Sequence, residues 1–399
     1  MTAGRGRVAV TGYARTPFGR FGGALRGIPL PALGAMPVRA ALARAGVEPE
    51  AVDEVALGVN FPAPERSVAR QVLLRSGLPD RCVAYTVDRA CCSSLAAISL
   101  ASRGLLAGDT AVAVAGGAEN LSRIPYFLTG MRWGVRRGPV ELADLAVVSC
   151  PHTGIPRAVQ AGAEAATFGI GRGEQDEWAL RSQQRYAQAL AAGVFDDEIE
   201  PVDALDEDGA AVALGRDEPP RPATTLEKLS ALGTVYGSAS VTAGNAPDLS
   251  SGASALVLTT GARATEPLAT LEGFSLVSGD PQKIASMPAE AARLALERSG
   301  LTIDEIDLIE INEAFAAVPL VTTLVLAGGD RERAQRLRER TNVNGGAIAI
   351  GHPTGATGAR LAMTAIAELR RRGGGTGLVT ICGGIGEAEA LIVRVGEGR

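Results

Sequence analysis

Residues 377–387 read Gly-Leu-Val-Thr-Ile-Cys-Gly-Gly-Ile-Gly-Glu, an apolar run that ends in a cysteine and opens onto two adjacent glycines. Before it, residues 359–372 carry apolar side chains at the i, i+3, i+4 spacing of a helix. The first half of the chain repeats this order of helix, strand and Gly-Gly turn, at residues 95–106, 111–115 and 116–119. Such units also recur by chance in α/β proteins, but two similar halves packed together would explain the repeat.

Further apolar runs and Ala/Leu-rich stretches alternate along the chain, which is the pattern of an α/β fold. The other strands that we expect are residues 8–10, 54–59, 255–260 and 308–311. The other helices that we expect are residues 33–45 and 289–299, and Pro37 would allow the first of them to begin only there.

The segment from residue 121 to residue 241 differs from its flanks, because it is richer in charge and in irregular sequence. Within it we expect a helix at residues 177–192 and a polar, proline-rich surface excursion at residues 203–225. We therefore expect three parts. They are a first half of residues 1–120 with 242–265, an inserted loop domain of residues 121–241, and a second half of residues 266–399.

The composition of the 399 residues is that of a globular protein, with 46% hydrophobic residues, 21% charged residues and a net charge of −5. The charges are scattered, so no basic stripe predicts nucleic-acid binding and no polybasic helix predicts a membrane surface. The N-terminus does not resemble a secretory signal. The longest uncharged apolar stretch, residues 314–329, contains a proline and is too short to span a membrane, so we expect a cytoplasmic protein.

Five cysteines and two histidines limit the chemistry that is available. An odd, sparse set of cysteines without a C-x-x-C pair argues against disulfides and structural zinc, and we expect no metal. A short β-like run stops at Cys91, and Ser93 and Ser94 are natural N-cap residues for the helix that follows. Free backbone N–H groups and the helix dipole would lower the thiol pKa of Cys91, although a buried structural cysteine fits the same position.

His352 lies in a glycine-rich run just before the helix predicted at residues 359–372. A histidine held on such a turn is well placed for acid–base chemistry, but a turn histidine without a role fits equally well. His152 lies in the irregular segment, and we expect it to be structural or exposed. Cys382 and Asn312 each follow a predicted strand, the usual place for active-site residues in α/β proteins, although Cys382 could also merely pack there.

Four short segments, in this order along the chain, resemble the active-site loops of the thiolase family. They are Cys91-Cys92-Ser93, Asn312-Glu313-Ala314-Phe315, Gly351-His352-Pro353 and Cys382-Gly383-Gly384. Residues 15–20, 116–122, 241–245 and 342–347 extend the resemblance over nearly the whole chain. The resemblance implies an α/β, five-layered αβαβα fold of two similar halves with an inserted loop domain.

The resemblance also implies a role for each catalytic residue. Cys91 would attack a thioester, or the ketone of a 3-ketoacyl-CoA, and form an acyl-enzyme. His352 would activate Cys91 and, with a water held by Asn312, bind the thioester oxygen. Backbone N–H groups of Cys91 and Gly384 would bind the acyl-enzyme oxygen. Cys382 would remove the α-proton of the second acyl-CoA, or return it in the reverse direction.

Family membership would make acyl-CoA and CoA the substrates, with no permanently bound cofactor. It would also place the chain in fatty acid metabolism as a homodimer or homotetramer. Arg221 and Lys228 lie where family members contact coenzyme A, and they could equally be solvated surface charges. Ala243, Ala314 and Phe315 lie in matching segments, and we expect them to contact the substrate.

Two substrate-facing segments depart from the family pattern. Pro247 stands where relatives usually have serine near the pantetheine arm of coenzyme A. Arg157 replaces a methionine that lies beside the reacting acyl group in biosynthetic relatives. Because an unpaired buried charge is costly, Arg157 either meets a polar group on the acyl chain or lies at the surface through a shift of the insertion.

The reaction that these motifs imply is Claisen condensation of an acyl-CoA with acetyl-CoA, or the reverse, CoA-dependent thiolysis of a 3-ketoacyl-CoA. A decarboxylating ketoacyl synthase of the same fold is a first alternative, but it needs no second catalytic cysteine at Cys382. A catalytically silent acyl-CoA-binding protein is a second alternative, which the altered substrate-facing segments permit.

Overall fold

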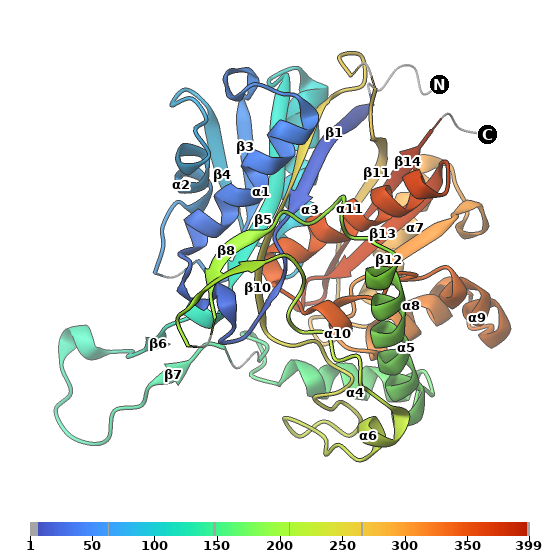
Figure 1. The fold of residues 1–399 in the computed structure, drawn as a ribbon. Helices are drawn as coiled ribbons and strands as arrows, with labels where there is room; N and C mark the ends of the chain where they lie inside the picture. Colours follow the sequence, from blue (N-terminus) through green and yellow to red (C-terminus); the bar gives the residue numbers. More distant parts are fainter. Residues whose placement is uncertain (1–6, 63, 147–148, 207, 265, 397–399) are drawn as a thin grey trace.

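The computed structural model describes residues 7–62, 64–146, 149–206, 208–264 and 266–396. A mixed sheet runs through it in the order β12-β13-β14-β11-β1-β10-β5-β3-β4, and β2 pairs with β10 beside this path (Figure 1). The strands of this sheet are β1 Val8–Arg15, β2 Gly19–Arg20, β3 Glu54–Gly58, β4 Val83–Val87, β5 Val112–Asn120, β10 Ser250–Thr260, β11 Ala269–Ser278, β12 Leu308–Ile311, β13 Gly375–Cys382 and β14 Glu387–Val395.

The two halves of the sheet have the same strand order. In the first half β10 pairs antiparallel with both β1 and β5, and β3 pairs parallel with β5 and β4. In the second half β14 pairs antiparallel with β11 and β13, β12 pairs parallel with β13, and Ile309 bridges Thr341 in parallel. The repeat expected from the sequence therefore extends to the whole topology.

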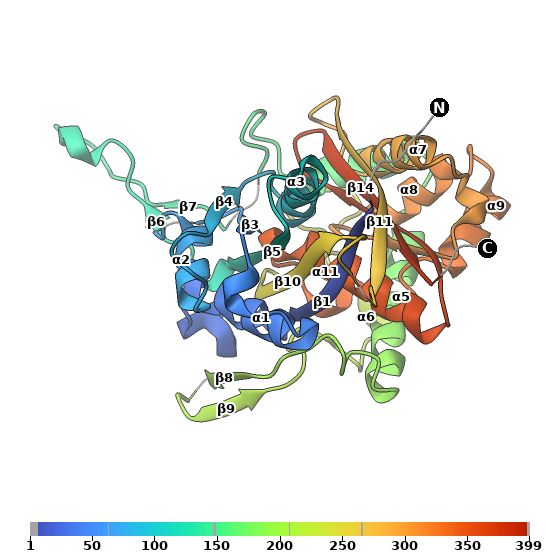
Figure 2. The same cartoon turned by 90° about the horizontal axis from the view of Figure 1, so that it is seen from above.

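The halves join where β1 meets β11, through the pairs Val8↔Leu271, Ala9↔Thr270 and Val10↔Ala269. Helices α3 and α11 pack against each other between the halves, α1 and α2 cover the outside of the first half, and α7 and α8 cover the outside of the second (Figures 1 and 2). These helices are α1 Leu30–Ala45, α2 Val68–Arg75, α3 Ser93–Ala107, α7 Met287–Ser299, α8 Ala317–Leu326 and α11 Thr354–Arg371. This is the expected five-layered αβαβα arrangement.

Helix α11 is buried on every side from Thr354 to Leu369, because it lies between the two halves of the sheet rather than on a surface. Small residues allow the close packing of this layer. The amide of Ala359 donates to Ser94 Oγ at 3.0 Å, and a Cβ on Gly358 would lie 2.8 Å from the amide nitrogen of Leu95. The first turn of α3 is therefore in contact with the second turn of α11.

Between β5 and β10 the chain leaves the sheet and forms several smaller elements. They are β6 Tyr126–Phe127, β7 Ala143–Asp144, α4 Arg157–Thr167, α5 Arg172–Ala191, β8 Val202–Leu205, β9 Ala211–Leu214 and α6 Leu226–Ser230. The hairpin of β6 and β7 projects far from the rest of the molecule (Figure 2). The second half adds α9 Arg331–Glu339 and α10 Ala347–Ile350. The three-part division at residues 121–241 stays a prediction.

The predicted turn at residues 116–119 is wrong, because β5 continues to Asn120. Gly116 and Gly117 are needed for close approach rather than for a turn. A Cβ on Gly116 would collide with the carbonyl of Ser254 in β10, and one on Gly117 would collide with the carbonyl of Gly355 in α11. A glycine pair thus marks a close contact as readily as a turn.

Three other expected elements also differ in detail. Helix α1 begins at Leu30 with Pro31 in its first turn, so Pro37 lies inside the helix. Helix α5 begins at Arg172, five residues before the expected start. The expected surface excursion at residues 203–225 contains the hairpin of β8 and β9, and its Asp217 is buried in an ion pair with Arg15 at 2.7 Å.

Candidate active site

Cys91 lies at the junction between β4 and α3 and is partly exposed. The expected N-cap role of Ser93 and Ser94 is wrong, because both lie within α3 and its N-terminus has no side-chain cap. Instead, Ser93 Oγ donates to the carbonyl of Ala90 at 2.6 Å and accepts from the amide of Arg89 at 2.9 Å. Ala90 has a φ of 49°, a strained backbone conformation for a non-glycine residue directly before the cysteine.

The expected low pKa of the Cys91 thiol is also corrected by the structure. Burial raises this pKa to about 12, although the charge of Arg157 and a backbone hydrogen bond act in the opposite direction. The cost of desolvating the thiolate therefore outweighs the favourable effect of the helix terminus. Cys91 is therefore a neutral thiol at rest and needs a base. The neighbouring Cys92 is fully buried and donates to the carbonyl of Ile381 at 3.5 Å.

His352 lies between α10 and α11 and is 8% exposed. Thr357 donates its hydroxyl proton to the carbonyl of Pro353 at 2.9 Å, so it accepts from Nδ1 of His352 at 2.7 Å. This network assigns the ring proton to Nδ1 and leaves Nε2 as the acceptor. Burial and the charge of Arg360 lower the pKa of His352 to about 3, so the imidazole is neutral.

Asn312 directly follows β12 and donates from Nδ2 to Nε2 of His352 at 3.3 Å. Its Oδ1 is buried and has no partner within the described residues. An acceptor of this kind beside the imidazole suits a bound water molecule. The adjacent Glu313 is an anchor for this loop, and its carboxylate accepts from Trp178, Ser182 and Asn342, among others.

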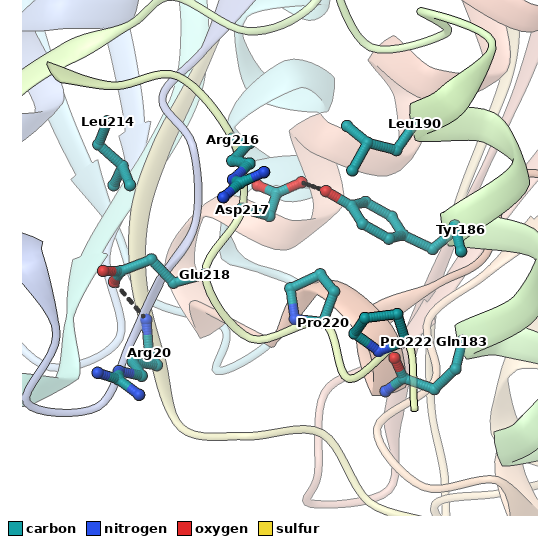
Figure 3. Close-up of a pocket in the computed structure, with 11 residues that line it drawn as sticks. Arg20, Gln183, Tyr186, Leu190, Leu214, Arg216, Asp217, Glu218, Pro220 and Pro222 are labelled. Atoms are coloured by element: carbon teal, nitrogen blue, oxygen red, sulfur yellow. Dashed lines mark hydrogen bonds between the residues drawn. The ribbon is translucent and has the colours of Figure 1, made fainter. Parts of the chain in front are cut away.

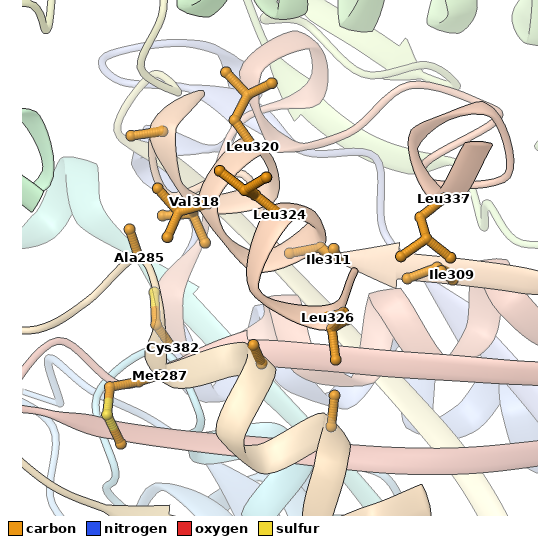
Figure 4. Packing of buried hydrophobic residues seen from close by; sticks show 14 of the residues in the cluster. Ala285, Met287, Ile309, Ile311, Val318, Leu320, Leu324, Leu326, Leu337 and Cys382 are labelled. Atoms are coloured by element: carbon orange, nitrogen blue, oxygen red, sulfur yellow. The ribbon is translucent and has the colours of Figure 1, made fainter. Parts of the chain in front are cut away.

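Cys382 ends β13 and lies in an apolar cluster with Ala285, Met287 and Val318 (Figure 4). Burial raises the pKa of its thiol, the neighbouring thiol of Cys91 raises it further, and Arg157 opposes both effects. The two thiols therefore lie close enough to act on each other electrostatically, and their common catalytic site stays a prediction.

Gly384 follows Cys382 with a φ of 78°, a left-handed conformation that favours glycine. A Cβ at this position would lie 3.4 Å from Cζ of Arg157. Arg157 is the first residue of α4 and only 9% exposed, which excludes the surface position considered from the sequence. Its Nη1 donates to Gln160 Oε1 at 3.0 Å.

Three of the predicted coenzyme A contacts lie around one cavity of about 310 Å³. Arg221, Lys228 and Ala243 line it together with apolar residues such as Leu229 and Leu232. Arg221 pairs with Asp248 at 2.9 Å, and Lys228 Nζ donates to the carbonyl of Ala223 at 2.8 Å. Pro247 lies between two lining residues, whereas Ala314 and Phe315 pack against the core of the second half instead.

A second cavity of about 470 Å³ lies next to the first, and Gln183 lines both. Its polar wall includes Asp217, which accepts from the hydroxyl of Tyr186 at 3.2 Å, and Glu218, which accepts from the amide of Arg20 at 3.1 Å (Figure 3). Nothing in the sequence analysis indicated this cavity.

Two profile models of known families cover almost all of the chain. "Thiolase, N-terminal domain" matches residues 8–262, and "Thiolase, C-terminal domain" matches residues 265–395. The chain belongs to the thiolase family. It is therefore an acyltransferase that uses CoA thioesters, and the expected reaction class is confirmed.

Individual thiolases match over nearly their full length. The chain is 40% identical to an acetyl-CoA acetyltransferase of Chromobacterium violaceum, over 97% of this chain and 99% of the relative. It is also 40% identical to a beta-ketoadipyl-CoA thiolase of Pseudomonas aeruginosa, over 97% and 98%. The crystal structure of the Bacillus anthracis acetyl-CoA acetyltransferase has 38% identity and a TM-score of 0.91, covering 98% of this chain and 99% of that one.

Two residues of this thiolase site were missed as contributors from the sequence. Thr357 orients His352, and Glu119 accepts from the amides of Asn60, Phe61 and Gly355 and from the hydroxyl of Thr354. Burial raises the pKa of Glu119 to about 7, although these hydrogen bonds act to lower it. The Gly-Gly-x-Glu segment was a signal for Glu119, whereas nothing in the sequence singled out one threonine in α11.

Within the described ranges, no group of three or more His, Cys, Asp or Glu residues could hold a metal ion. One helical stretch, Ala90–Ala107, is long and apolar enough to cross a membrane, but 61% of it is buried. It contains α3, and its apolar character is explained by its place between the two halves of the sheet.

Proposed function

We propose that this acyltransferase forms or cleaves the carbon–carbon bond of a 3-ketoacyl-CoA, with Cys91 carrying the acyl group and Cys382 moving the α-proton. The observation that carries the proposal is the contact between the first turn of α3 and the second turn of α11. This contact supports a site to which the first half contributes the partly exposed thiol of Cys91 and the second half the neutral imidazole of His352.

The first half-reaction uses Cys91 and His352. Nε2 of His352 takes the thiol proton, and the thiolate attacks the thioester carbonyl. The imidazolium then donates from Nε2 to the oxyanion, together with a water on Asn312. When the tetrahedral intermediate collapses, the C–S bond to CoA breaks and His352 returns its proton to the CoA thiolate. The acyl group remains on Cys91, and the amides of Cys91 and Gly384 bind its oxygen.

The second half-reaction uses Cys382. Nε2 of His352, which is neutral again after the first half-reaction, takes the proton of the Cys382 thiol. The Cys382 thiolate removes the α-proton of a second acyl-CoA, and the resulting carbanion attacks the acyl group on Cys91. The C–C bond forms as the C–S bond to Cys91 breaks, and the departing Cys91 thiolate takes the proton back from His352. In thiolysis the same steps run backwards, and Cys382 donates its proton to the departing carbanion. A thiol whose pKa is raised by burial is suited to that donation.

We assign the cavity around Arg221, Lys228 and Ala243 to coenzyme A, with Pro247, Ala314 and Phe315 nearer the pantetheine arm and the acyl group. Apolar walls and two basic side chains at an exposed mouth suit a ligand that combines an apolar arm with phosphates. The names of relatives do not select an acyl chain, since identity is 40% both to an acetyl-CoA acetyltransferase and to a beta-ketoadipyl-CoA thiolase.

We also propose a compartment, a pathway and an oligomeric state for the protein: it acts in the cytoplasm, in fatty acid metabolism, as a homodimer or homotetramer. Strand β4 supports self-association, because it is the last strand of the sheet and exposes Val83 and Tyr85. The projecting β6–β7 hairpin supports it as well, since it carries exposed Tyr126, Leu128 and Trp133.

The acyl-enzyme is the test of this function. Wild type mixed with acetyl-CoA should gain the mass of one acetyl group, and peptide mapping should place that group on Cys91. Cys91→Ser should gain none and should lose thiolysis of acetoacetyl-CoA, whereas Cys150→Ser should behave like wild type. An acetyl group on Cys92 or Cys150 would contradict the assignment of the nucleophile, and a wild type without any adduct would contradict the reaction.

A further inference from the structure

Arg157 is a buried cation at the centre of the candidate active site. Its guanidinium lies over Gly384, with Cζ and Nη2 both 3.4 Å from the position of an added Cβ. The same charge acts on the thiols of Cys91 and Cys382. The side chain therefore lies beside Gly384, whose amide is assigned to the oxygen of the acyl group on Cys91.

The carboxylates near these thiols are occupied by other partners. Glu164 accepts from the amides of residues 284–286 and from the Ser286 hydroxyl, and Glu119 accepts from four donors around α11 and residues 60–61. Glu387 and Glu389 both pair with Arg89. Within the described residues Arg157 has no ion pair, and its hydrogen-bond partner is the neutral amide of Gln160.

A buried guanidinium without a counter-charge lowers stability, since desolvation of a charge costs several kcal/mol unless a partner replaces the water. The two thiols do not supply that charge at rest, because burial raises both of their pKa values. Arginine presents parallel N–H donors that match a carboxylate, and a methionine or leucine would fill the same space without this cost. The missing partner is therefore expected to arrive with the substrate.

We propose that Arg157 binds a carboxylate on the acyl chain, so that this enzyme acts on short 3-ketoacyl-CoA esters that end in a carboxyl group. The inference rests on the proposed function and adds its substrate class. The chain has to be short, because the guanidinium lies against Gly384, whose amide is assigned to the acyl oxygen. Gln160 holds the guanidinium toward the site and is a positioning residue.

The experiment compares thiolysis of acetoacetyl-CoA with thiolysis of short 3-ketoacyl-CoA esters that end in a carboxyl group. Wild type should prefer a carboxylated ester. Arg157→Met should lower kcat/KM for that ester on the order of 10²-fold, as expected when one partner of a buried charge pair is removed, and should shift the preference toward acetoacetyl-CoA. Arg157→Lys keeps the positive charge without the paired N–H donors, so its kcat/KM for the carboxylated ester should lie between those of wild type and Arg157→Met. Arg293→Met, which removes an exposed arginine from α7, should match wild type.

Two results would overturn the inference and leave the proposed function standing. The first is an Arg157→Met variant whose kcat/KM falls by the same factor on both substrates and whose Cys91 is alkylated only at higher pH. Arg157 would then act only as a counter-charge for the Cys91 thiolate. The other is a wild type that cleaves acetoacetyl-CoA but no carboxylated ester. A wild type that cleaves neither and gains no acetyl group would instead contradict the proposed function.

Discussion

At the scale of single residues, the neutral state of His352 has a consequence for stability. Its folded-state pKa of about 3 lies below the usual value of about 6.5, so the unfolded chain takes up the proton first as the pH falls. The stability linked to this group is fully present above about pH 6.5 and is lost as the pH falls toward 3. We predict that between pH 7 and pH 5 wild type loses about 2 kcal/mol more unfolding free energy than His352→Asn, as measured by urea denaturation. Equal losses would show that His352 titrates normally in the folded protein.

Cys382 allows the two half-reactions to be separated. Cys382→Ala should still accept an acetyl group on Cys91, because that step needs only the nucleophile and His352. Condensation should fall roughly 10²–10⁴-fold, the usual contribution of a general acid–base group. Cys82→Ala, which removes a buried thiol from the far side of the first half, is the control. If acylation and condensation fell together in Cys382→Ala, Cys382 would have only a structural role.

At the scale of the secondary-structure elements, Glu119 ties the end of β5 to the start of α11. In Glu119→Gln an amide NH₂ group, which can only donate, replaces one of the two acceptor oxygens. It then faces the N–H and O–H donors that the oxygen accepted from in wild type. We predict a loss of about 1–3 kcal/mol in unfolding free energy. The acylation rate should fall as well, since His352 lies only two residues before the start of α11. Thermal unfolding and the acetyl-transfer rate measure these effects, and the exposed Glu297→Gln in α7 should change neither. A normal melting temperature would show that the donors are not essential at this junction.

The ends of the strands and helices show which features of the fold and the candidate site could be predicted from the sequence. Strand ends and helix starts singled out Cys91, Asn312, His352 and Cys382 as candidates, because a periodic apolar pattern stops at each of these junctions. The resemblance to thiolases then predicted their roles. The extension of β5 through residues 116–119 could not be predicted, since its glycines respond to β10 and α11, which lie far away in the sequence. The high thiol pKa of Cys91 likewise depends on burial by both halves.

At the scale of the whole molecule, the proposed oligomer can be tested at the open edge of the sheet. Val83 and Tyr85 are 50% and 44% exposed on β4, which ends the sheet. The double substitution Val83→Lys and Tyr85→Lys should lower the oligomeric state, because charged side chains on an edge strand prevent edge-to-edge pairing. Size-exclusion chromatography with light scattering measures the mass. Leu205→Lys, on the exposed face of β8, is the matched control and should leave the mass unchanged. A double variant that keeps the wild-type mass would place the interface elsewhere.

The position of β1 affects how the protein is made. Val8 pairs with Thr260 on one side and with Leu271 on the other, so neither edge of this apolar strand has its partner until those residues have left the ribosome. A nascent chain that already contains Cys91 therefore carries an unpaired β1, whose apolar residues are buried only in the folded protein, while nearly two hundred further residues are added. Pairing between such distant segments is slow and prone to aggregation. Synthesis that stops before β10 should yield an insoluble fragment that chaperones retain, even though most of the first half has been translated.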